Sequence, residues 1–373
     1  IGTKTLKLID QYDLKIKINL LVCKNNYKKL INQIHKYKPK YVYIENEKYL
    51  SYLKDKKLNT NIIPNKKKLD YLLSNSKTNM SILSIDGISA LKYLSLIIKN
   101  TDNLGLVNKE CIVSAGHLFT KLNVHKKTNI YPLDSEHFSL FNLFEKKIFN
   151  KEIKKIYITA SGGSLYKKNI KKSKIRLKNV INHPKWNMGI KNSIDSSTLA
   201  NKCLEIIEAK YLFNIDFKKI DILIHPEALV HSIIEFNDFT YFFNYFYNDM
   251  SIPLLNFLFK SIKKNNFPTI NKYQIKNNFA LSFDSDSLKN YPIYNIFKSL
   301  NKNKPINLIK FNILNEFAVN LFAKGMLKYD EIPRFIKENL ASKEKNNLNS
   351  INGILDYNDK INNILNAKYI LND

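Results

Sequence analysis

The sequence predicts a protein of the α/β class in three parts, and three patterns carry this prediction. In residues 1–133, short apolar runs alternate with amphipathic helical stretches, which is typical of βαβ units and a parallel sheet. Residues 134–270 combine further strands with loops and a long helix, which indicates an α+β part. A connecting segment at 271–304 leads to residues 305–373, where the pattern is helical throughout.

The individual elements follow from periodicity and from turn residues. Strands are expected in five apolar segments: 15–23, 41–45, 80–86, 130–137 and 154–163, the last two running into loops. Helices are expected around 27–37 and 90–98, and from about Ser196 to Phe213. The helical pattern that begins near residue 305 is expected to end at Gly325, because glycine favours the C-cap.

Composition excludes several classes of protein. No run of eighteen apolar residues occurs, so we expect no membrane span and no membrane partner. The three cysteines are scattered, which argues against a disulfide scaffold and fits a reducing compartment. The formal net charge of +28 first suggests nucleic acid, but only Arg176 and Arg334 are arginines. We therefore interpret the lysines mainly as a solvated surface, and a basic nucleic-acid-binding protein remains the alternative.

The start of the sequence bears on the first sheet. Residue 1 is Ile, and neither an apolar signal nor an Arg-rich presequence follows it. We expect the sequence to begin inside a longer gene product, so that the first strand and most of a glycine-rich phosphate turn are missing. Ile1 and Gly2, which run into an apparent helix, are interpreted as the end of that turn.

A possible nucleotide site follows the strand at 15–23. In nucleotide-binding sheets, an acidic residue at the end of the second strand accepts hydrogen bonds from the ribose 2′-hydroxyl. Here the strand ends in Cys23, Lys24 and Asn25. A lysine and an asparagine in place of the carboxylate suit a 2′-phosphate and hence NADPH, although an ordinary turn in a lysine-rich chain is the alternative.

Carboxylates occur at two places with suggestive spacing. In "LDSEH", Asp134 and Glu136 lie two apart at a strand end, and extended geometry would project both from one side. The helix "SSTLANKCLEIIEA" carries Asn201, Glu205 and Glu208 on one stripe. Carboxylates without Cys or His at ligand spacing favour Mg²⁺ or Mn²⁺. Salt bridges, such as one between Glu205 and Lys202, are the alternative.

Two segments have the local features of a phosphate site. "ASGGS" at 160–164 follows a strand with two glycines, which lets backbone N–H groups approach an anion, and "DSSTLANK" opens a predicted helix. Ser161, Ser196, Asn201 and Lys202 would supply the donors. A helix cap by Asp195 or Ser196 is the alternative interpretation.

The segment "HPKWNMG" at 183–189 is expected to be a loop, because Pro184 and Gly189 bracket it. A Trp and a Met in such a loop are what a mobile flap over a cofactor ring requires. A core position for this single Trp is the alternative.

Taken together, the motifs resemble the 1-deoxy-D-xylulose 5-phosphate reductoisomerase family, whose members are NADPH- and metal-dependent enzymes of non-mevalonate isoprenoid biosynthesis. The matching blocks appear in the family's order: "LVNKECIVSAG" (106–116), "PLDSEH" (132–137), "TASGG" (159–163), "HPKWNMG" (183–189), "SIDSSTLANKCLEIIEAKYLF" (193–213), "IDILIHPEALVHSIIEF" (220–236), "NDMSIP" (248–253) and "NILNEFAVNLF" (312–322). Several blocks in register are far more specific than a single motif.

The resemblance implies roles for individual residues. The implied metal ligands are Asp134, Glu136 and Glu205, and Lys109 is implied to act with them in catalysis. The implied substrate contacts are Lys109, Ser135, Glu136, Ser161, His183, Trp186, Ser196, Asn201, Lys202 and Glu205. The implied cofactor contacts are Ile1, Cys23, Lys24, Asn25, Asn108, Glu110, Met188, Gly189 and Met250. Trp186 and Met188 would form the flap.

The resemblance also implies fold and activity. It implies a Rossmann-like NADPH-binding domain at 1–133, lacking its first strand, a catalytic α+β domain at 134–270, and a helical bundle at 305–373. The implied reaction converts 1-deoxy-D-xylulose 5-phosphate to 2-C-methyl-D-erythritol 4-phosphate by retro-aldol cleavage and aldol recombination, then hydride reduction. A homodimer in the bacterial cytoplasm is expected, with the plastid stroma of a parasite as the alternative location.

Two departures from the family pattern affect these implications. Cys23 stands where a glycine is expected, and "GGSL" at 162–165 replaces the family's usual "GGPF". A catalytically silent relative is therefore a further alternative, although every implied metal ligand is present.

Overall fold

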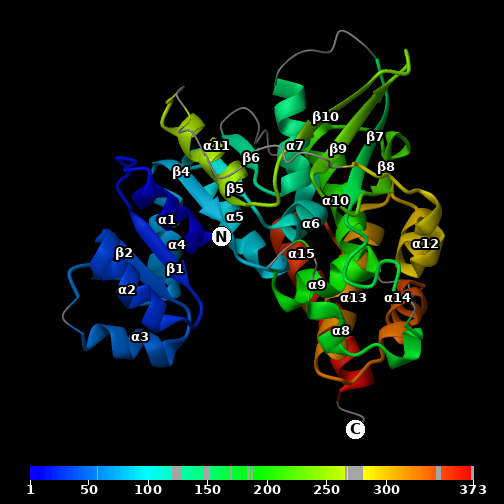
Figure 1. Cartoon of the computed structure of the whole chain (residues 1–373). Coiled ribbons are helices and arrows are strands. Elements are labelled where there is room, and N and C mark those ends of the chain that lie inside the picture. Colours follow the sequence, from blue (N-terminus) through cyan, green and yellow to red (C-terminus); the bar gives the residue numbers. More distant parts are fainter. Residues whose placement is uncertain are drawn as a thin grey trace.

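The computed structural model describes residues 1–56, 58–119, 128–145, 152–168, 170–182, 185, 188–264, 267, 280–341 and 346–370. Figure 1 shows an N-terminal part set to one side of a central sheet and a group of C-terminal helices. The described strands form two three-stranded parallel sheets, β1-β2-β3 and β4-β5-β6, and one four-stranded mixed sheet with the order β10-β9-β7-β8. The predicted α/β class is therefore confirmed.

The first sheet alternates with helices as expected. Its elements are α1 (Gly2–Gln11), β1 (Leu20–Cys23), α2 (Tyr27–Tyr37), β2 (Tyr41–Ile44), α3 (Glu47–Lys54), β3 (Asn61–Ile62) and α4 (Lys66–Asn75). The asparagine-rich composition fixes the helix starts, because Asn26, Asn46 and Asn65 each accept a hydrogen bond from a backbone N–H of the first turn. Strand β1 is shorter than the predicted segment 15–23.

The second sheet positions the site. It comprises β4 (Thr78–Leu83), β5 (Thr101–Leu106) and β6 (Asn129–Pro132), with η1 (Ile88–Ala90) and α5 (Leu91–Ile97) between the first two. Because these strands are parallel, their carboxyl ends share one edge. Helices α6 (Lys109–Phe119) and α7 (Ser135–Glu145) both begin at that edge.

One local prediction at this edge is wrong. We expected a strand and then a loop at 130–137; the strand is present and ends at Pro132, but the chain is already helical at Ser135. The cause is the Asp134 side chain, whose Oδ1 accepts a hydrogen bond from the backbone N–H of Glu136 at 3.3 Å and starts α7. Asp134 and Glu136 therefore do not project from an extended strand.

The central sheet contains β7 (Ile153–Ala160), β8 (Ile220–Ile224), β9 (Val230–Phe236) and β10 (Tyr241–Tyr245). The short helices η3 (Lys172–Lys174), α8 (Leu177–Ile181) and η4 (Phe217–Lys219) lie between β7 and β8 in the chain. The helix expected from about Ser196 is in fact two helices, α9 (Ile190–Thr198) and α10 (Ala200–Phe213). They are separated at Leu199, which has a φ of +61°. Ser196 thus lies in the last turn of α9, so neither it nor Asp195 caps a helix start.

The remaining helices form the C-terminal part, except α11 (Ser251–Ser261), which packs against α1 of the N-terminal part. The others are η5 (Asp286–Asn290), α12 (Pro292–Ser299), α13 (Pro305–Ala323), η6 (Tyr329–Glu331), α14 (Ile332–Leu340) and α15 (Ile351–Tyr369). Helix α13 is apolar around much of its circumference and contacts α6, α9, α14 and α15. Its end agrees with the prediction, because Gly325 follows it with a φ of +79°.

None of the helices in the described part of the chain is both long enough and apolar enough to cross a membrane.

Candidate active site

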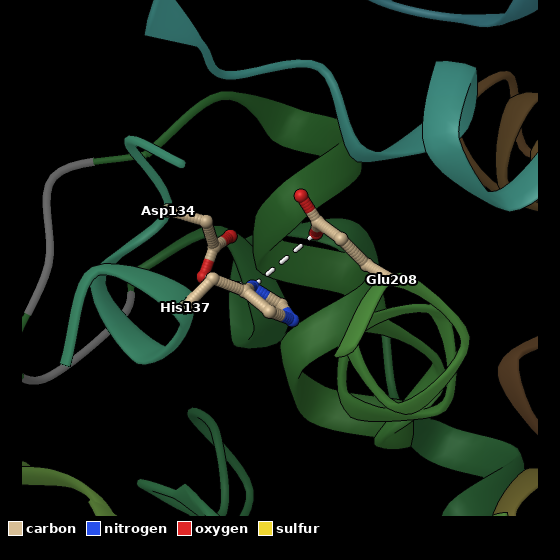
Figure 2. A group of neighbouring side chains, drawn as sticks. All are labelled: Asp134, His137 and Glu208. Atoms are coloured by element: carbon tan, nitrogen blue, oxygen red, sulfur yellow. Dashed lines mark ion pairs between the residues drawn. The ribbon is translucent and has the colours of Figure 1, made fainter. Parts of the chain in front are cut away.

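Asp134 lies at the junction between β6 and α7, where the carboxyl edge of the second sheet meets helix α10. Figure 2 shows its carboxylate close to the ring of His137, one turn along α7, and to Glu208 on α10. The His137 ring is fully buried, and Asp134 Oδ1 lies 3.4 Å from its Nδ1. The start of α7 and the middle of α10 are therefore joined through polar side chains.

Three predicted carboxylates come together at this junction. Oxygen atoms of Asp134, Glu136 and Glu205 all lie within 4.8 Å of one another, although Glu205 is far from the other two in sequence. Asp134 and Glu136 come from the start of α7, and Glu205 comes from the second turn of α10. Glu205 is 1% exposed and Glu136 is 8% exposed, so these charges are largely removed from water.

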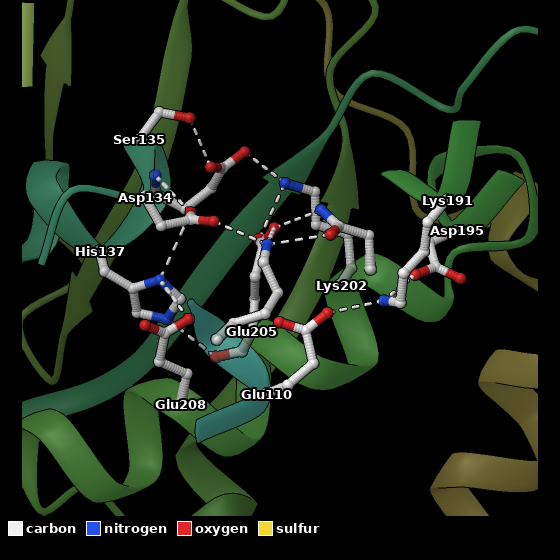
Figure 3. Close-up of polar contacts among 12 residues, drawn as sticks. Glu110, Asp134, Ser135, His137, Lys191, Asp195, Lys202, Glu205 and Glu208 are labelled. Carbon is white, nitrogen blue, oxygen red and sulfur yellow. Dashed lines mark hydrogen bonds and ion pairs between the residues drawn. The ribbon is translucent and has the colours of Figure 1, made fainter. Parts of the chain in front are cut away.

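Two lysines lie among the carboxylates, as Figure 3 shows for Lys202. Lys109 Nζ donates to Asp134 Oδ2 at 2.7 Å and to Glu205 Oε1 at 2.9 Å. Lys202 Nζ donates to Glu205 Oε2 at 2.9 Å and also to Glu136 Oε1. The salt bridge between Glu205 and Lys202 that we considered as an alternative is thus present, but it is part of a larger buried network.

Two polar side chains complete this network. Asn201 accepts from Lys109 Nζ at 2.9 Å through Oδ1 and donates to Glu205 Oε1 through its amide. Ser135 Oγ donates to Glu136 Oε2 at 2.6 Å. Asn201 and Ser135, which the sequence placed on the substrate side, therefore directly contact the carboxylates.

Burial and pairing shift the pKa values in opposite directions within this cluster. Burial opposes the charge of Asp134, but the Lys109 ammonium and His137 hold the pKa of Asp134 well below its usual range. Burial also opposes the charge of Lys109, but the carboxylates of Asp134 and Glu205 raise the pKa of Lys109 well above its ordinary value. Both groups are therefore charged at neutral pH.

Glu136 behaves differently from Asp134. Burial, together with repulsion from the Glu205 carboxylate, raises the pKa of Glu136 to about 8. A carboxyl group with such a pKa exchanges a proton near neutral pH, which is the property required of an acid or base.

The donor set fits a hard divalent cation. Once Asp134, Glu136 and Glu205 are all ionised, as metal coordination requires, they exceed the Lys109 and Lys202 ammonium groups by one negative charge, which favours a cation. Carboxylate oxygens are the ligands that Mg²⁺ and Mn²⁺ prefer. With a doubly charged ion bound, the net charge of the cluster becomes positive, which favours binding of an anionic substrate.

Of the predicted phosphate-binding residues, Asn201 and Lys202 contact the carboxylates directly, and Ser161 and Ser196 lie on two segments that pack together. The loop after β7 turns at Gly162 and Gly163, which have φ values of +82° and +73°. This loop lies against the end of α9, because a Cβ built on Gly163 would be 2.7 Å from the carbonyl oxygen of Ser196. The glycine turn after Ser161 is therefore packed against Ser196, and Asn201 and Lys202 begin the next helix.

The predicted cofactor residues lie mainly at the carboxyl ends of the parallel strands. Cys23, Lys24 and Asn25 follow β1, and Lys24 and Asn25 are exposed. Ile1 precedes α1, whose start makes no side-chain cap hydrogen bond, so its first N–H groups face outward from the helix. Carboxyl ends of parallel strands are where dinucleotides bind in such sheets, so this placement fits NADPH.

The other cofactor candidates lie at or near the starts of helices α6, α9 and α11. Asn108 precedes α6 and donates to the carbonyl oxygen of Gly87 at 3.0 Å, which anchors the loop after β4. Met188 and Gly189 immediately precede α9, and Met250 precedes α11. Asp249, beside Met250, pairs with Lys4 of α1 and so links this segment to the N-terminal helix.

Glu110, another predicted cofactor contact, belongs to a second buried charge group (Figure 3). Lys191 on α9 pairs with Glu110 Oε1 at 2.7 Å and with Asp195 Oδ2 at 2.8 Å. Asp195 also accepts from Asn315 on α13 at 2.8 Å. This group fixes α9 against α6 and α13, so it sets the position of the helix that follows the predicted flap.

His137 was not predicted from the sequence, although it ends the block "LDSEH". The available signal was its position one helical turn after Asp134, which was hidden because we expected an extended strand there. Lys191 and Asn315 were not predicted either, because Lys191 contacts Glu110 on α6 and Asn315 contacts Asp195 on α9, far away in sequence. The predicted substrate residue His183 and the predicted flap residue Trp186 lie outside the described residues.

Comparisons with known proteins agree with this arrangement. Family models match along most of the chain: "1-deoxy-D-xylulose 5-phosphate reductoisomerase" at residues 1–116, its C-terminal domain at 130–213, and "DXP reductoisomerase C-terminal domain" at 247–364. The chain is 35% identical to the 1-deoxy-D-xylulose 5-phosphate reductoisomerase of Persephonella marina over 91% of this chain and 87% of that protein. It is 32% identical to the Clostridium acetobutylicum protein of the same name, over 99% and 96% of the two chains.

Solved structures show the same likeness. A crystal structure described as DOX-P reductoisomerase in complex with NADPH, fosmidomycin and magnesium superposes with a TM-score of 0.85 at 26% identity, covering 99% of this chain and 96% of that one. A second, described as a complex with magnesium, has a TM-score of 0.84 at 26% identity, with the same coverage of both chains. Sequence blocks, fold and site geometry thus agree, and the chain belongs to the 1-deoxy-D-xylulose 5-phosphate reductoisomerase family.

Proposed function

We propose that this chain converts 1-deoxy-D-xylulose 5-phosphate to 2-C-methyl-D-erythritol 4-phosphate, using NADPH and a divalent metal ion, Mg²⁺ or Mn²⁺. It is thus an oxidoreductase that also isomerises its substrate. Family membership supports the reaction, and similar structures contain NADPH and magnesium. The observation that carries the proposal is the convergence of Asp134, Glu136 and Glu205 in one buried cluster.

The residues of the cluster would have different roles in the reaction. A divalent ion held by the three carboxylates supplies a Lewis acid for the carbonyl and hydroxyl oxygens of the substrate. Lys109 adds a fixed positive charge beside these oxygens, because its ammonium is held by Asp134, Glu205 and Asn201. Glu136 would relay a proton at its carboxyl group.

The substrate phosphate would lie between the glycine turn and α10. Ser161, Ser196, Asn201 and Lys202 provide hydroxyl, amide and ammonium donors there, and Ser135 would contact the sugar beside the metal. We propose His183 and Trp186 as further substrate contacts on the strength of the sequence motif alone. Binding a phosphate away from the reacting carbons fixes the orientation of the substrate.

NADPH would lie across the carboxyl ends of the parallel strands. Lys24 and Asn25 would contact the 2′-phosphate after β1, and Ile1 would contact the dinucleotide at the start of α1. Asn108, Glu110, Met188, Gly189 and Met250 would lie toward the nicotinamide, and Cys23 would lie beside the ribose. When bound, the cofactor supplies the hydride, and the chain orients its ring toward the substrate carbon.

A turnover assay tests this function. Oxidation of NADPH is followed by absorbance with 1-deoxy-D-xylulose 5-phosphate and Mn²⁺. The native chain is expected to turn over, and Asp134→Asn and Glu205→Gln are each expected to lower kcat at least 100-fold with the fold intact, because each removes a charged ligand.

A matched control separates loss of a ligand from loss of a buried carboxylate. Glu235 on β9 is also buried, pairs with Lys154 at 2.8 Å, and lies outside the proposed site. Glu235→Gln is expected to retain turnover. Native rates in the Asp134 and Glu205 variants would refute the metal assignment, and a native chain that folds but does not oxidise NADPH would indicate a silent relative.

We further propose that the chain forms a homodimer through the outer face and free edge of the central sheet. Strand β10 lies at one edge of this sheet, and Tyr241 and Phe243 on it are 53% and 44% exposed. The alternate residue Phe242 packs inward against Phe236. Exposed aromatic residues on an edge strand favour association with another chain.

A bacterial cytoplasmic location is likewise a proposal, supported by the bacterial relatives.

A further inference from the structure

Glu208 is a fully buried carboxylate that the proposed reaction does not use. It lies on α10, one turn after Glu205, and is 0% exposed. Neither of its carboxylate oxygens makes a hydrogen bond to any residue that the structure describes. The nearby cationic partner is the ring of His137, with Nδ1 3.3 Å from Glu208 Oε2 (Figure 2). A buried carboxylate with so few partners is costly, so its presence calls for a role.

The ring of His137 connects two of the proposed metal ligands. Its Nε2 lies 2.9 Å from the backbone carbonyl oxygen of Glu205, which only accepts, so Nε2 carries a hydrogen and donates it. Its Nδ1 faces Asp134 Oδ1 at 3.4 Å. One ring therefore contacts the side chain of one ligand and the backbone of another, and the two come from different helices.

We propose that Glu208 is a positioning residue, which acts through His137 to hold Asp134 and Glu205 at the separation that a divalent ion requires. The inference rests on the metal site of the proposed function. The negative charge of Glu208 favours a hydrogen on Nδ1 of the His137 ring, which lies between the carboxylates of Glu208 and Asp134. This hydrogen attracts Asp134 Oδ1 and so holds it toward the ring. Asp134 Oδ2 then faces Lys109 and the cluster. Residues behind metal ligands commonly orient them in this way.

Glu208→Gln tests the role, because it preserves shape, removes the negative charge and offers the ring an amide donor. With that donor facing it, Nδ1 can present a lone pair to Asp134 and repel the ligand. Mn²⁺ affinity is measured by isothermal titration calorimetry, without substrate or NADPH. We expect affinity in Glu208→Gln to fall 10- to 100-fold, the range typical for residues behind metal ligands. The control Glu235→Gln should bind Mn²⁺ as the native chain does.

A double-mutant cycle shows whether Glu208 acts through the ring. In a His137→Gln background, Glu208→Gln is expected to change Mn²⁺ affinity by less than about twofold, because the connecting group is already gone. Equal losses with and without His137 would contradict the proposal, since they would indicate direct attraction between Glu208 and the ion. Two Mn²⁺ per native chain, with the second lost in Glu208→Gln, would also overturn it, since Glu208 would then itself be a ligand.

The outcomes are distinguishable from failure of the proposed function. If the native chain binds no Mn²⁺, the metal assignment itself fails. If the native chain binds Mn²⁺ and a folded Glu208→Gln binds it equally well, only the positioning role fails. Should Glu208→Gln not fold, Glu208→Asp takes its place, since it withdraws the carboxylate from the ring by one methylene. A loss of at least threefold is then expected, and native affinity would contradict the proposal.

Discussion

At the scale of single residues, burial decides which charges the chain keeps. Asp134 and Lys109 stay charged because each has a partner of opposite charge, whereas Glu136 has a raised pKa because it lies beside Glu205. The sequence could identify these residue types and their motifs. It could not give the pKa values, because these depend on distances between α6, α7 and α10.

His231 on β9 is a buried base whose state follows from the same reasoning. Its Nε2 donates to the carbonyl oxygen of Phe246 at 3.2 Å, and its ring stacks on that of Phe246 at 4.1 Å between centroids. Burial, with a further contribution from Lys202, lowers the pKa of His231 to about 3. The unfolded chain therefore binds a proton at His231 between about pH 6.5 and 3 that the folded chain does not.

This difference predicts a pH-dependent loss of stability. As the pH falls from 7 to 5, the native chain should lose about 2 kcal/mol more free energy of unfolding than His231→Gln does, since protons favour the unfolded state. Urea denaturation at both pH values measures the difference. His35→Gln, which changes an exposed histidine on α2, should respond like the native chain. Identical losses in the native chain and His231→Gln would show that His231 is not held neutral.

At the scale of elements, periodicity predicted several helices and strands, but it did not predict the starts of the site helices. Helix α2 coincides with the predicted range 27–37, because its apolar stripe and its Asn26 cap agree. The loop expected after the strand at 130–137 is instead the start of α7, and the helix expected from Ser196 breaks at Leu199. At both places, buried polar contacts determine the backbone conformation more strongly than the local sequence pattern does. Such departures from sequence rules are expected at functional sites.

The close packing of the glycine turn after β7 against α9 can be tested by substitution. A Cβ on Gly163 would lie 2.6 Å from the Cα of Ser197, and the φ of this residue is +73°. Gly163→Ala should therefore lower the free energy of unfolding by about 2–4 kcal/mol and raise the KM for the sugar phosphate, since it displaces the loop from α9.

Gly325→Ala is the matched control for Gly163→Ala. Gly325 has a similar φ of +79°, but no heavy atom lies within 4 Å of the added Cβ. Only the backbone cost of about 1 kcal/mol is expected, with an unchanged KM. Chemical denaturation and steady-state kinetics compare the two variants. Equal destabilisation by both would contradict the close approach of the loop to α9.

At the scale of the whole molecule, the site forms where helices from the second sheet meet helices of the central part (Figure 1). Helix α11, which the sequence placed in the segment 134–270, packs with α1 in a core that contains Leu8, Ile9, Leu254 and Phe257. An apolar stripe predicts that a helix is buried but not which element covers it. The domain boundaries that we assigned from sequence therefore stay predictions.

The proposed dimer belongs to this scale. Phe243→Lys should convert the chain to a monomer, because it places a charge on the exposed face of the edge strand β10. Size-exclusion chromatography with light scattering gives the mass in solution. Tyr71→Lys on α4, where the aromatic is 61% exposed, should leave the native mass unchanged. A native chain that is monomeric at micromolar concentration would contradict the proposed interface.

The most direct test of the central claim is anomalous diffraction from crystals of the native chain grown with Mn²⁺. A peak is expected at roughly 2.0–2.3 Å from an oxygen of each of Asp134, Glu136 and Glu205, as carboxylate coordination requires. Absence of a peak at saturating Mn²⁺, or a peak only among Asp134, His137 and Glu208, would contradict it.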